Sequence, residues 1–292
     1  MKIGRLTLGI FIAAIIEFSV IGGVVYAYRK NIENKKVEIY TVFHKPWEIY
    51  RNDIVIPIHA GRALGNPQEY PLLKEMIGDD TGDNISPKNR KYSELTVLYW
   101  MWKNSNADYV GLMHYRRYLN LSQFMLPSDC HDDLLCKYGL KKENVLRIMK
   151  DVDIVAIEYT RSFSMYYDFA SYHFPENMEM VLDYLREHYP KEFIGAGQVL
   201  MSKQLYGCNM FLMKKEILDK YAAWLFEILF ALEEKFVYTN WQSQFGRCTP
   251  YRDQYNLRIP SFVGERLFAF WLKAHEKEYN IVKVPLSFVG DN

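Results

Sequence analysis

Apolar and polar positions along the chain follow two periods in turn, and this pattern predicts strands separated by helices. Short runs rich in β-branched and aromatic residues predict strands at residues 37–43, 54–59, 108–113, 151–157 and 209–213. Helical spacing of apolar positions predicts helices at residues 93–104, 145–150, 177–188, 214–235 and 264–275. Gly195 and Gly197 predict a turn after the third helix. Strands that alternate with helices indicate βαβ units, so we expect an α/β domain with a mostly parallel central sheet flanked by helices.

The amino terminus differs in kind from the rest of the chain. Residues 6–28 form an apolar run broken only by Glu17, and at ~1.5 Å per residue such a run crosses the ~30 Å hydrocarbon core of a bilayer. The run exceeds the ~7–15 residues of a signal-peptide core, although residues 25–27 offer a small-residue site for cleavage. Four basic residues within positions 29–36 follow the run, against two before it. We therefore expect one transmembrane helix, as anchor and linker at residues 1–36, and one domain at residues 37–292 on the cytoplasmic side.

Composition narrows the classes of function. Of the 292 residues, 24% are charged and 49% are hydrophobic, and the formal net charge is +1. This balance gives no general reason to expect nucleic-acid binding. The aromatic share of 16% suits a sugar-handling protein and equally a well-packed core. The cysteines at positions 130, 136, 208 and 248 show neither a CxxC pair nor metal-site spacing, so we expect no zinc site, no disulfide framework and a reducing compartment.

Charged residues appear abruptly where a buried strand ends. The apolar run at residues 107–113 is followed by His114, Tyr115, Arg116 and Arg117. Ligands of open α/β sheets bind outside the carboxyl ends of the strands, and paired guanidinium groups match phosphate or carboxylate oxygens. The segment therefore indicates an anion site, with an exposed basic turn that pairs with a surface acid as the alternative.

A loop at residues 77–86 carries three carboxylates, Asp79, Asp80 and Asp83. Clustered carboxylate oxygens are typical ligands of hard cations, so the loop is a candidate metal or nucleotide site. The alternative is a polar turn held by hydrogen bonds of the aspartate side chains to nearby backbone. The loop lacks the Glu at the twelfth position that an EF-hand needs.

Seven segments, in order from residue 40 toward the end of the chain, resemble a bacterial protein family. They are YTVFHKPWEIY (40–50), IPIHAGRALG (56–65), GDDTGDNIS (78–86), YSELTVLYWMWKN (92–104), ADYVGLMHYRRYL (107–119), NMFLMKKEIL (209–218) and GERLF (264–268). The family is encoded in capsular, exopolysaccharide and O-antigen gene clusters and carries a domain of unknown function that is described as a glycosyltransferase. The resemblance implies a GT-A-like single domain that uses a nucleotide-diphosphate sugar.

The resemblance leaves the use of a metal open. GT-A enzymes commonly present a DXD motif at a strand end, where a divalent cation bridges to the donor diphosphate. His114, Tyr115 and Arg116 stand at that strand end, so the expected DXD motif is missing. Arg116 and Arg117 can then neutralise the leaving diphosphate without a metal. Alternatively, His114 or the three aspartates of the loop at residues 77–86 supply ligands for Mn²⁺ or Mg²⁺.

The resemblance also implies a carboxylate that takes the proton from the acceptor hydroxyl in an inverting transfer. Glu265 is the candidate, because the sequence predicts that it opens a helix at the place where similar GT-A enzymes carry an acidic base. Asp253 lies in a less regular loop, and Glu94 lies early in a helix. The alternative for Glu265 is a simple charge at a helix terminus, paired with Arg266.

The sequence thus predicts a membrane-anchored glycosyltransferase of the bacterial inner (cytoplasmic) membrane. Thr41, His44 and Arg62, near the ends of the first two strands, are further candidate contacts of the nucleotide. The expected acceptor is a growing, lipid-linked capsular, exopolysaccharide or O-antigen glycan, since an anchor at residues 6–28 suits a lipid-linked substrate. Two alternatives stay open: a non-catalytic sugar-nucleotide or glycan-binding subunit of a polysaccharide assembly complex, and a sugar-phosphate transferase that uses the same arginines.

Overall fold

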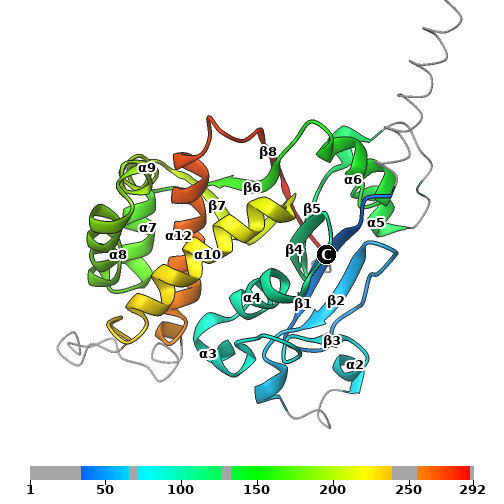
Figure 1. The fold of residues 1–292 in the computed structure, drawn as a ribbon, viewed down its shortest axis with the longest axis horizontal. Coiled ribbons are helices and arrows are strands. Elements are labelled where there is room, and N and C mark those ends of the chain that lie inside the picture. Colours follow the sequence, from blue (N-terminus) through cyan, green and yellow to red (C-terminus); the bar gives the residue numbers. More distant parts are fainter. Residues whose placement is uncertain (1–33, 66–70, 126–129, 131–132, 239–254, 290–292) are drawn as a thin grey trace, which may run out of the picture. The chain divides into compact units, whose positions relative to one another are not determined.

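A central sheet runs through the structure, a computed structural model that describes residues 34–65, 71–125, 130, 133–238 and 255–289 (Figure 1). Its strands are β1 (Val37–Phe43), β2 (Val55–His59), β3 (Ile77–Gly78), β4 (Tyr109–His114), β5 (Arg117–Leu119), β6 (Ile154–Thr160), β7 (Gln204–Lys214), β8 (Ile281–Val284) and β9 (Leu286–Phe288). The predicted strands correspond to β1, β2, β4, β6 and part of β7, with the ends displaced by up to five residues.

The helices cover the sheet and connect its strands. They are α2 (Pro71–Lys74), α3 (Asn89–Tyr92), α4 (Leu95–Asn104), α5 (Leu134–Lys137), α6 (Lys142–Met149), α7 (Met165–Tyr172), α8 (Pro175–His188), α9 (Pro190–Met201), α10 (Lys215–Leu232) and α12 (Ile259–Ala274), with short 3₁₀ helices at Arg62–Leu64, Ser86–Lys88 and Ser122–Phe124. In the described part of the chain, no helix has the length and apolarity to span a bilayer. The predicted anchor at residues 6–28 lies outside the described residues.

The sheet is mixed, which corrects the expectation of a mostly parallel one. Along the order β3-β2-β1-β4-β7-β6-β8, the first four strands are parallel, as are β6 and β8. β7 runs antiparallel to both of its neighbours, and the pairs β4-β5 and β5-β9 are also antiparallel. Gln204 at the start of β7 pairs with Thr160 at the end of β6, so β7 has to run back along β6. Hydrophobic periodicity does not encode strand direction, which is why the sequence did not predict this reversal.

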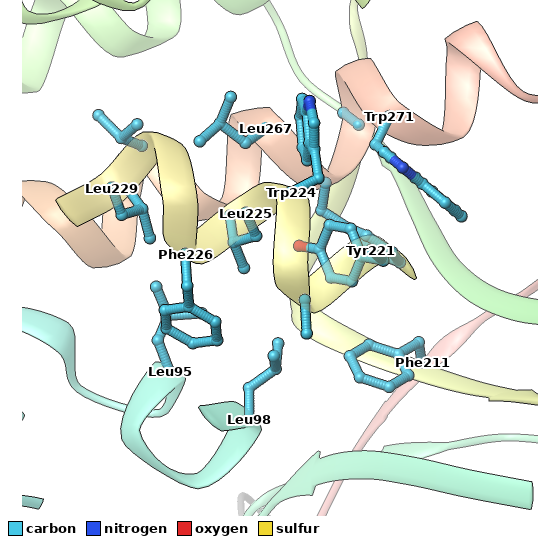
Figure 2. Close-up of a cluster of buried hydrophobic side chains, with 14 of the residues drawn as sticks. Leu95, Leu98, Phe211, Tyr221, Trp224, Leu225, Phe226, Leu229, Leu267 and Trp271 are labelled. Atoms are coloured by element: carbon cyan, nitrogen blue, oxygen red, sulfur yellow. The ribbon is translucent and has the colours of Figure 1, made fainter. Parts of the chain in front are cut away.

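The main hydrophobic core lies between the sheet and the helices α4, α10 and α12. Every residue of β1 is buried, as expected for a strand covered on both faces. Figure 2 shows the side chains of α10 between the other two helices: Leu225 and Phe226 lie near Leu95 and Leu98 of α4, and Leu267 comes from α12. This packing fixes the orientation of α4 and α12 at the edge of the sheet.

Glu233, just after α10, joins α10 to the segment that leads into α4. Its carboxylate accepts hydrogen bonds from Lys88 at 2.5 Å, from Lys91 at 3.2 Å and from the Tyr92 hydroxyl at 3.0 Å. Glu233 is 6% exposed. A buried carboxylate that is paired in this way stabilises the fold only while it is ionised.

Gly195 and Gly197 lie inside α9, so the predicted turn at this point is wrong. A Cβ atom on Gly195 would lie 3.1 Å from the carbonyl oxygen of Phe270 and 3.2 Å from the backbone nitrogen of Ala274, both on α12. Glycine at this position therefore allows two helices to approach closely. The sequence does not distinguish a glycine used for helix packing from a glycine used for a turn.

Cys130 and Cys136 form a disulfide, which corrects the expectation that the cysteines form none. Asp133 caps the short helix α5 by accepting a hydrogen bond from the Cys136 N–H. The resulting turn brings the two Cα atoms to 5.4 Å, within the range that a disulfide requires. The pairing depends on this local turn, which the spacing of the cysteines alone does not reveal. Cys208 carries a free thiol, and residue 248 lies outside the described residues.

Candidate active site

A cleft of about 690 Å³ lies at the edge of the sheet where β1, β4 and β6 end. Because these three strands point the same way, the residues that follow them meet at this edge. His44 and Lys45 follow β1, the segment from His114 to Arg117 follows β4, and Arg161 follows β6. The start of α12 closes the cleft on another side.

A tight hairpin places the two adjacent arginines in the cleft. His114 at the end of β4 pairs with Arg117 at the start of β5. The backbone N–H of Tyr115 donates to the carbonyl oxygen of Val42 at 3.1 Å, and the carbonyl oxygen of Arg116 accepts the N–H of Val289 at 3.0 Å. Hydrogen bonds on both sides therefore fix this hairpin to β1 and to the end of the described chain.

The side chains of the hairpin have different environments. Tyr115 is buried and packs with Phe43 in a small core cluster. The guanidinium group of Arg116 lies 5.3 Å from the ring centre of Trp47 and 5.4 Å from that of Tyr115. Stacking on two rings holds a guanidinium group in place while leaving its N–H groups able to bind an anion.

An irregularity in β7 connects the hairpin to α12. Cys208 and Asn209 have φ angles of 63° and 51°, and the pairing of β6 with β7 shifts register beside them. The carbonyl oxygen of Cys208 accepts a hydrogen bond from Nε2 of His114 at 2.7 Å. The backbone N–H of Cys208 donates to Oε1 of Glu265 at 2.6 Å. One strained residue thus hydrogen-bonds both His114 and Glu265. Non-glycine residues in this conformation cluster at functional sites because the surrounding structure must hold them there.

Strained backbone recurs elsewhere in the cleft. Ser93, between α3 and α4, has φ 49° and ψ −125° and also lines the cleft. Among the described residues, the non-glycine residues with positive φ are Ser93, Cys208 and Asn209. Two of them line the cleft, and the third donates a hydrogen bond to Glu94, which also lines it.

Glu265 lies in the middle of α12 and not in its first turn, which corrects the prediction for this helix. The helix begins at Ile259, with Pro260 in its first turn. Proline at this position is a start signal that the sequence analysis did not use. Glu265 therefore reaches the cleft because it lies on the helix face that lines the cleft. The helix dipole does not stabilise the Glu265 carboxylate in the way that it stabilises a carboxylate in the first turn.

A buried ionic network holds the Glu265 carboxylate. Arg266 is 3% exposed and donates to Oε2 of Glu265 at 2.8 Å and to Oδ2 of Asp168, on α7, at 2.8 Å. Asp168 also lies 3.5 Å from Nε of Arg161, which lines the cleft. The ion pair of Glu265 with Arg266 was the alternative interpretation from the sequence, and the structure shows this pair and the cleft location together.

Glu94 is a second carboxylate in the cleft. Its Oε1 accepts hydrogen bonds from the Asn209 amide at 2.7 Å and from the Ser261 hydroxyl at 3.0 Å. Glu94 is buried, whereas Glu265 keeps intermediate exposure. The sequence analysis considered Glu94 and set it aside, but the structure places it in the same cleft.

Positive charge predominates in this cleft. Its lining, as far as the chain is described, carries two carboxylates against six basic side chains: Lys45, Arg90, Arg116, Arg117, Arg161 and Arg258. Partial enclosure in the cleft, together with the charges of Lys45 and Arg258, lowers the pKa of His44 to about 4, so its imidazole is neutral at pH 7. Burial and the nearby carboxylate of Glu265 raise the pKa of the Cys208 thiol to about 12. This thiol is therefore a poor nucleophile.

The donor set of the cleft does not fit a divalent cation. Both of its carboxylates already accept hydrogen bonds from N–H or O–H donors, and most of the remaining charged groups are cations. Within the described ranges, His, Cys, Asp and Glu form no group of three or more that can hold a metal ion. A ligand that suits this lining is an anion, such as a diphosphate.

Asp79, Asp80 and Asp83 lie outside the lining of the cleft. Asp79 is fully buried and accepts hydrogen bonds from two backbone N–H groups and two hydroxyls. Asp80 is exposed, and Asp83 accepts a hydrogen bond from the Tyr99 hydroxyl at 3.1 Å. This arrangement agrees with the alternative interpretation of the loop as a turn held by its aspartates.

Thr41 and Arg62 also lie outside the lining of the cleft. The guanidinium group of Arg62 donates to the carbonyl oxygens of Leu73 and Met76. Thr41 lies within β1 and is fully buried. Of the residues predicted from the sequence, the structure brings six together in the cleft: His44, His114, Tyr115, Arg116, Arg117 and Glu265.

The sequence analysis missed several residues that line the cleft. Arg258, Ser261 and Phe262 share the spacing of one helix face with the predicted Glu265, and this pattern was available in the sequence. Arg161 lies just after β6, so its place near the end of a predicted strand was also a signal in the sequence. Residue 253, considered as a candidate base, lies outside the described residues.

Comparison with known proteins places this architecture in a family. The domain of unknown function DUF4422 matches residues 38–277 of the chain. The chain belongs to this family. No curated protein matches it. The DUF4422 chain is similar to the apo structure of the bifunctional glycosyltransferase WbbM, with a TM-score of 0.71 and 29% sequence identity over 88% of this chain. The match covers 46% of the WbbM chain, so the present chain spans less than half of that protein's length.

Proposed function

We propose that this DUF4422 protein transfers a sugar from a nucleotide-diphosphate donor to a glycan acceptor. The observation that carries the proposal is the pairing of a cationic hairpin with an ion-paired carboxylate across one cleft, both oriented by the backbone of Cys208. The similarity to a glycosyltransferase supports the same reaction class. Sugar transfer needs these two functions together: stabilisation of a leaving diphosphate and removal of a proton from the attacking hydroxyl.

Arg116 and Arg117 are the proposed ligands of the donor diphosphate. The hairpin fixes their backbone, and the stack on Trp47 and Tyr115 fixes the Arg116 guanidinium group. Preorganised cations stabilise the charge that develops on a leaving group without reorganising during the reaction. We propose on this basis that transfer proceeds without a divalent cation. His44, neutral at pH 7, serves as a hydrogen-bonding group and not as a cation.

Glu265 is the proposed general base of an inverting transfer. The acceptor oxygen forms a bond to the anomeric carbon while the bond from that carbon to the diphosphate oxygen breaks. The proton of the acceptor hydroxyl passes to Glu265, and the negative charge leaves on the diphosphate beside the arginines. Each carboxylate oxygen of Glu265 accepts one hydrogen bond, at 2.6 Å and 2.8 Å, which leaves lone pairs for the proton. We prefer Glu265 to Glu94 because the side chain of Glu265 is the more exposed of the two.

The cellular setting is part of the proposal. We propose a lipid-linked capsular, exopolysaccharide or O-antigen acceptor at the bacterial inner membrane, with the apolar run at residues 6–28 as a single-pass anchor. The proposal does not include the cytoplasmic orientation expected from the sequence, because the disulfide between Cys130 and Cys136 favours an oxidising compartment and disulfides are rare in cytosolic proteins.

Calorimetric titration of UDP and GDP into the full-length chain tests the donor site. Arg116→Ala should weaken binding by roughly 10- to 100-fold, because a hydrogen bond to a charged group contributes about 1.5–3 kcal/mol. Arg186→Ala is the matched control, since Arg186 is exposed on α8 and pairs with Asp183. Equal nucleotide affinity in the wild type and in Arg116→Ala would refute the diphosphate assignment, and added Mn²⁺ should leave the wild-type affinity unchanged.

A further inference from the structure

Arg258, immediately before α12, and three side chains of the first two turns of this helix line the cleft. Arg258, Ser261, Phe262 and Glu265 are separated by three, one and three residues, which places them on one face of the helix. Phe262 precedes Glu265 by three residues, or about 4.5 Å along the helix axis at ~1.5 Å per residue. An aromatic ring therefore lies close to the proposed base, on the same helix face.

This ring belongs to a packed group of three. The ring centres of Phe262 and Tyr255 are 4.7 Å apart, and both residues line the cleft. His173 lies behind them, 5.5 Å from Tyr255 and nearly parallel to it at 7°, and 4.3 Å from Phe262. His173 is 7% exposed, whereas Phe262 and Tyr255 keep intermediate exposure. The buried imidazole thus supports two rings that present a partly open surface to the cleft.

A tethered cation borders the same group. The guanidinium group of Arg258 lies 5.2 Å from the ring centre of Phe262, and its Nε donates to the Ser93 hydroxyl at 2.8 Å. Ser93 is one of the strained residues described above. Rings held on several sides in a polar cleft form a ready surface for a ligand that combines an apolar face with hydroxyl groups.

We propose that Phe262 and Tyr255 bind the apolar face of a sugar ring of the acceptor and set one of its hydroxyls against Glu265. This proposal rests on the proposed function, and names its second substrate site. A nucleobase does not suit this place, because a ribose and two phosphates separate it from the anomeric carbon. The acceptor hydroxyl, in contrast, has to lie beside both the base and that carbon during transfer.

Saturation-transfer NMR with simple glycosides tests the proposal. The probes are the methyl glycosides of glucose, galactose and mannose, and sorbitol serves as an open-chain polyol without a ring face. Phe262→Leu keeps an apolar side chain but removes the flat ring, and Phe262→Tyr restores the ring. Phe163→Leu is the matched control, since Phe163 is 59% exposed and lies outside the cleft lining.

The wild-type full-length chain should bind at least one methyl glycoside in preference to sorbitol. Phe262→Leu should weaken that binding by roughly five- to tenfold, which is the range of an aromatic stacking contact. Phe262→Tyr and Phe163→Leu should bind like the wild type, and calorimetry should give UDP and GDP affinities within about twofold for all variants.

Three results would overturn the assignment: no glycoside binding by the wild type, equal glycoside binding in Phe262→Leu, or loss of nucleotide affinity in Phe262→Leu. The last result would place the ring on the donor side. The wild type could instead fail to bind UDP or GDP while its glycoside binding still depends on Phe262. This result would count against the proposed donor and would still support the binding of a sugar ring by Phe262 and Tyr255.

Discussion

Replacement of Asp79 by alanine tests whether this aspartate has a structural role or binds a metal ion or nucleotide. Asp79 follows β3 and is fully buried. Its carboxylate accepts hydrogen bonds from the N–H groups of Gly61 at 2.8 Å and Arg62 at 3.1 Å, and from the hydroxyls of Ser86 and Thr96 at 2.5 Å each. These bonds join the end of β2, the loop after β3 and α4. We expect Asp79→Ala to destabilise the fold strongly and to leave metal binding unaffected.

The magnitude follows from the groups that lose their acceptor. The Thr96 hydroxyl has a second acceptor in the carbonyl oxygen of Ser93 at 3.0 Å, and the Ser86 hydroxyl can rotate, so both lose less than a fixed backbone N–H when the carboxylate is removed. The N–H groups of Gly61 and Arg62 lose the acceptor that they now have. A buried donor left without a partner costs about 1–3 kcal/mol, so two of them destabilise by about 4 kcal/mol. In a domain of this size, about 4 kcal/mol lowers the unfolding temperature by roughly 8–16 °C.

Thermal unfolding of the full-length chain, followed by tryptophan fluorescence, measures this change. The control is Asp80→Ala, because Asp80 is exposed and surface substitutions usually change stability by less than about 0.5 kcal/mol. An unfolding temperature for Asp79→Ala within about 2 °C of the wild type would refute the reasoning. So would a stabilisation of the wild type by Mn²⁺ that Asp79→Ala abolishes, since this would make Asp79 a metal ligand.

Two further predictions concern close packing and pH. A Cβ on Gly207 would overlap the ring of Tyr159 in the cleft, so Gly207→Ala should lower the free energy of unfolding by about 1–3 kcal/mol. Gly197 lies on α9 with open space around it, so Gly197→Ala should raise the free energy of unfolding by about 0.5–1 kcal/mol. Urea unfolding of both variants measures these two changes. Burial alone would raise the pKa of Glu233, but hydrogen bonds from two lysines and Tyr92 outweigh burial and hold this pKa below 4.5. The stability that Glu233 contributes is therefore present above pH 4.5 and is lost as the pH falls through the lowered pKa. The stability difference between the wild type and Glu233→Gln should shrink as the pH falls below 4.5, and an equal difference at pH 4 and pH 7 would contradict this prediction.

The sequence predicted best those elements whose signal is local. β1 has the predicted bounds, because six of its seven residues are apolar or β-branched and the run is bounded by a polar linker and by His44. The hairpin of Arg116 and Arg117 lies where the sequence placed charge at a strand end. The parallel direction of β2 and β4, which a predicted helix separates, follows from the predicted βαβ order and is confirmed.

Features that depend on distant contacts were not predictable in the same way. The antiparallel insertion of β7 depends on the path of the chain through α7, α8 and α9. Asp168, on α7, joins the ion pair of Arg266 and Glu265 only because of that path. The start of α12 is different, since Pro260 offered a local signal that a search for acidic first-turn residues overlooked.

The central claim is that the cleft transfers a sugar from a nucleotide-diphosphate donor, with Glu265 as base. The most direct measurement is chromatographic analysis of the nucleotide products that the full-length chain releases from a panel of UDP- and GDP-sugars. The account predicts release of the nucleoside diphosphate from at least one donor, a rate at least about 100-fold lower in Glu265→Gln, and an unchanged rate in the exposed control Glu276→Gln. Release of the nucleoside monophosphate would instead indicate sugar-phosphate transfer. No turnover of any donor, or full turnover by Glu265→Gln, would contradict the account.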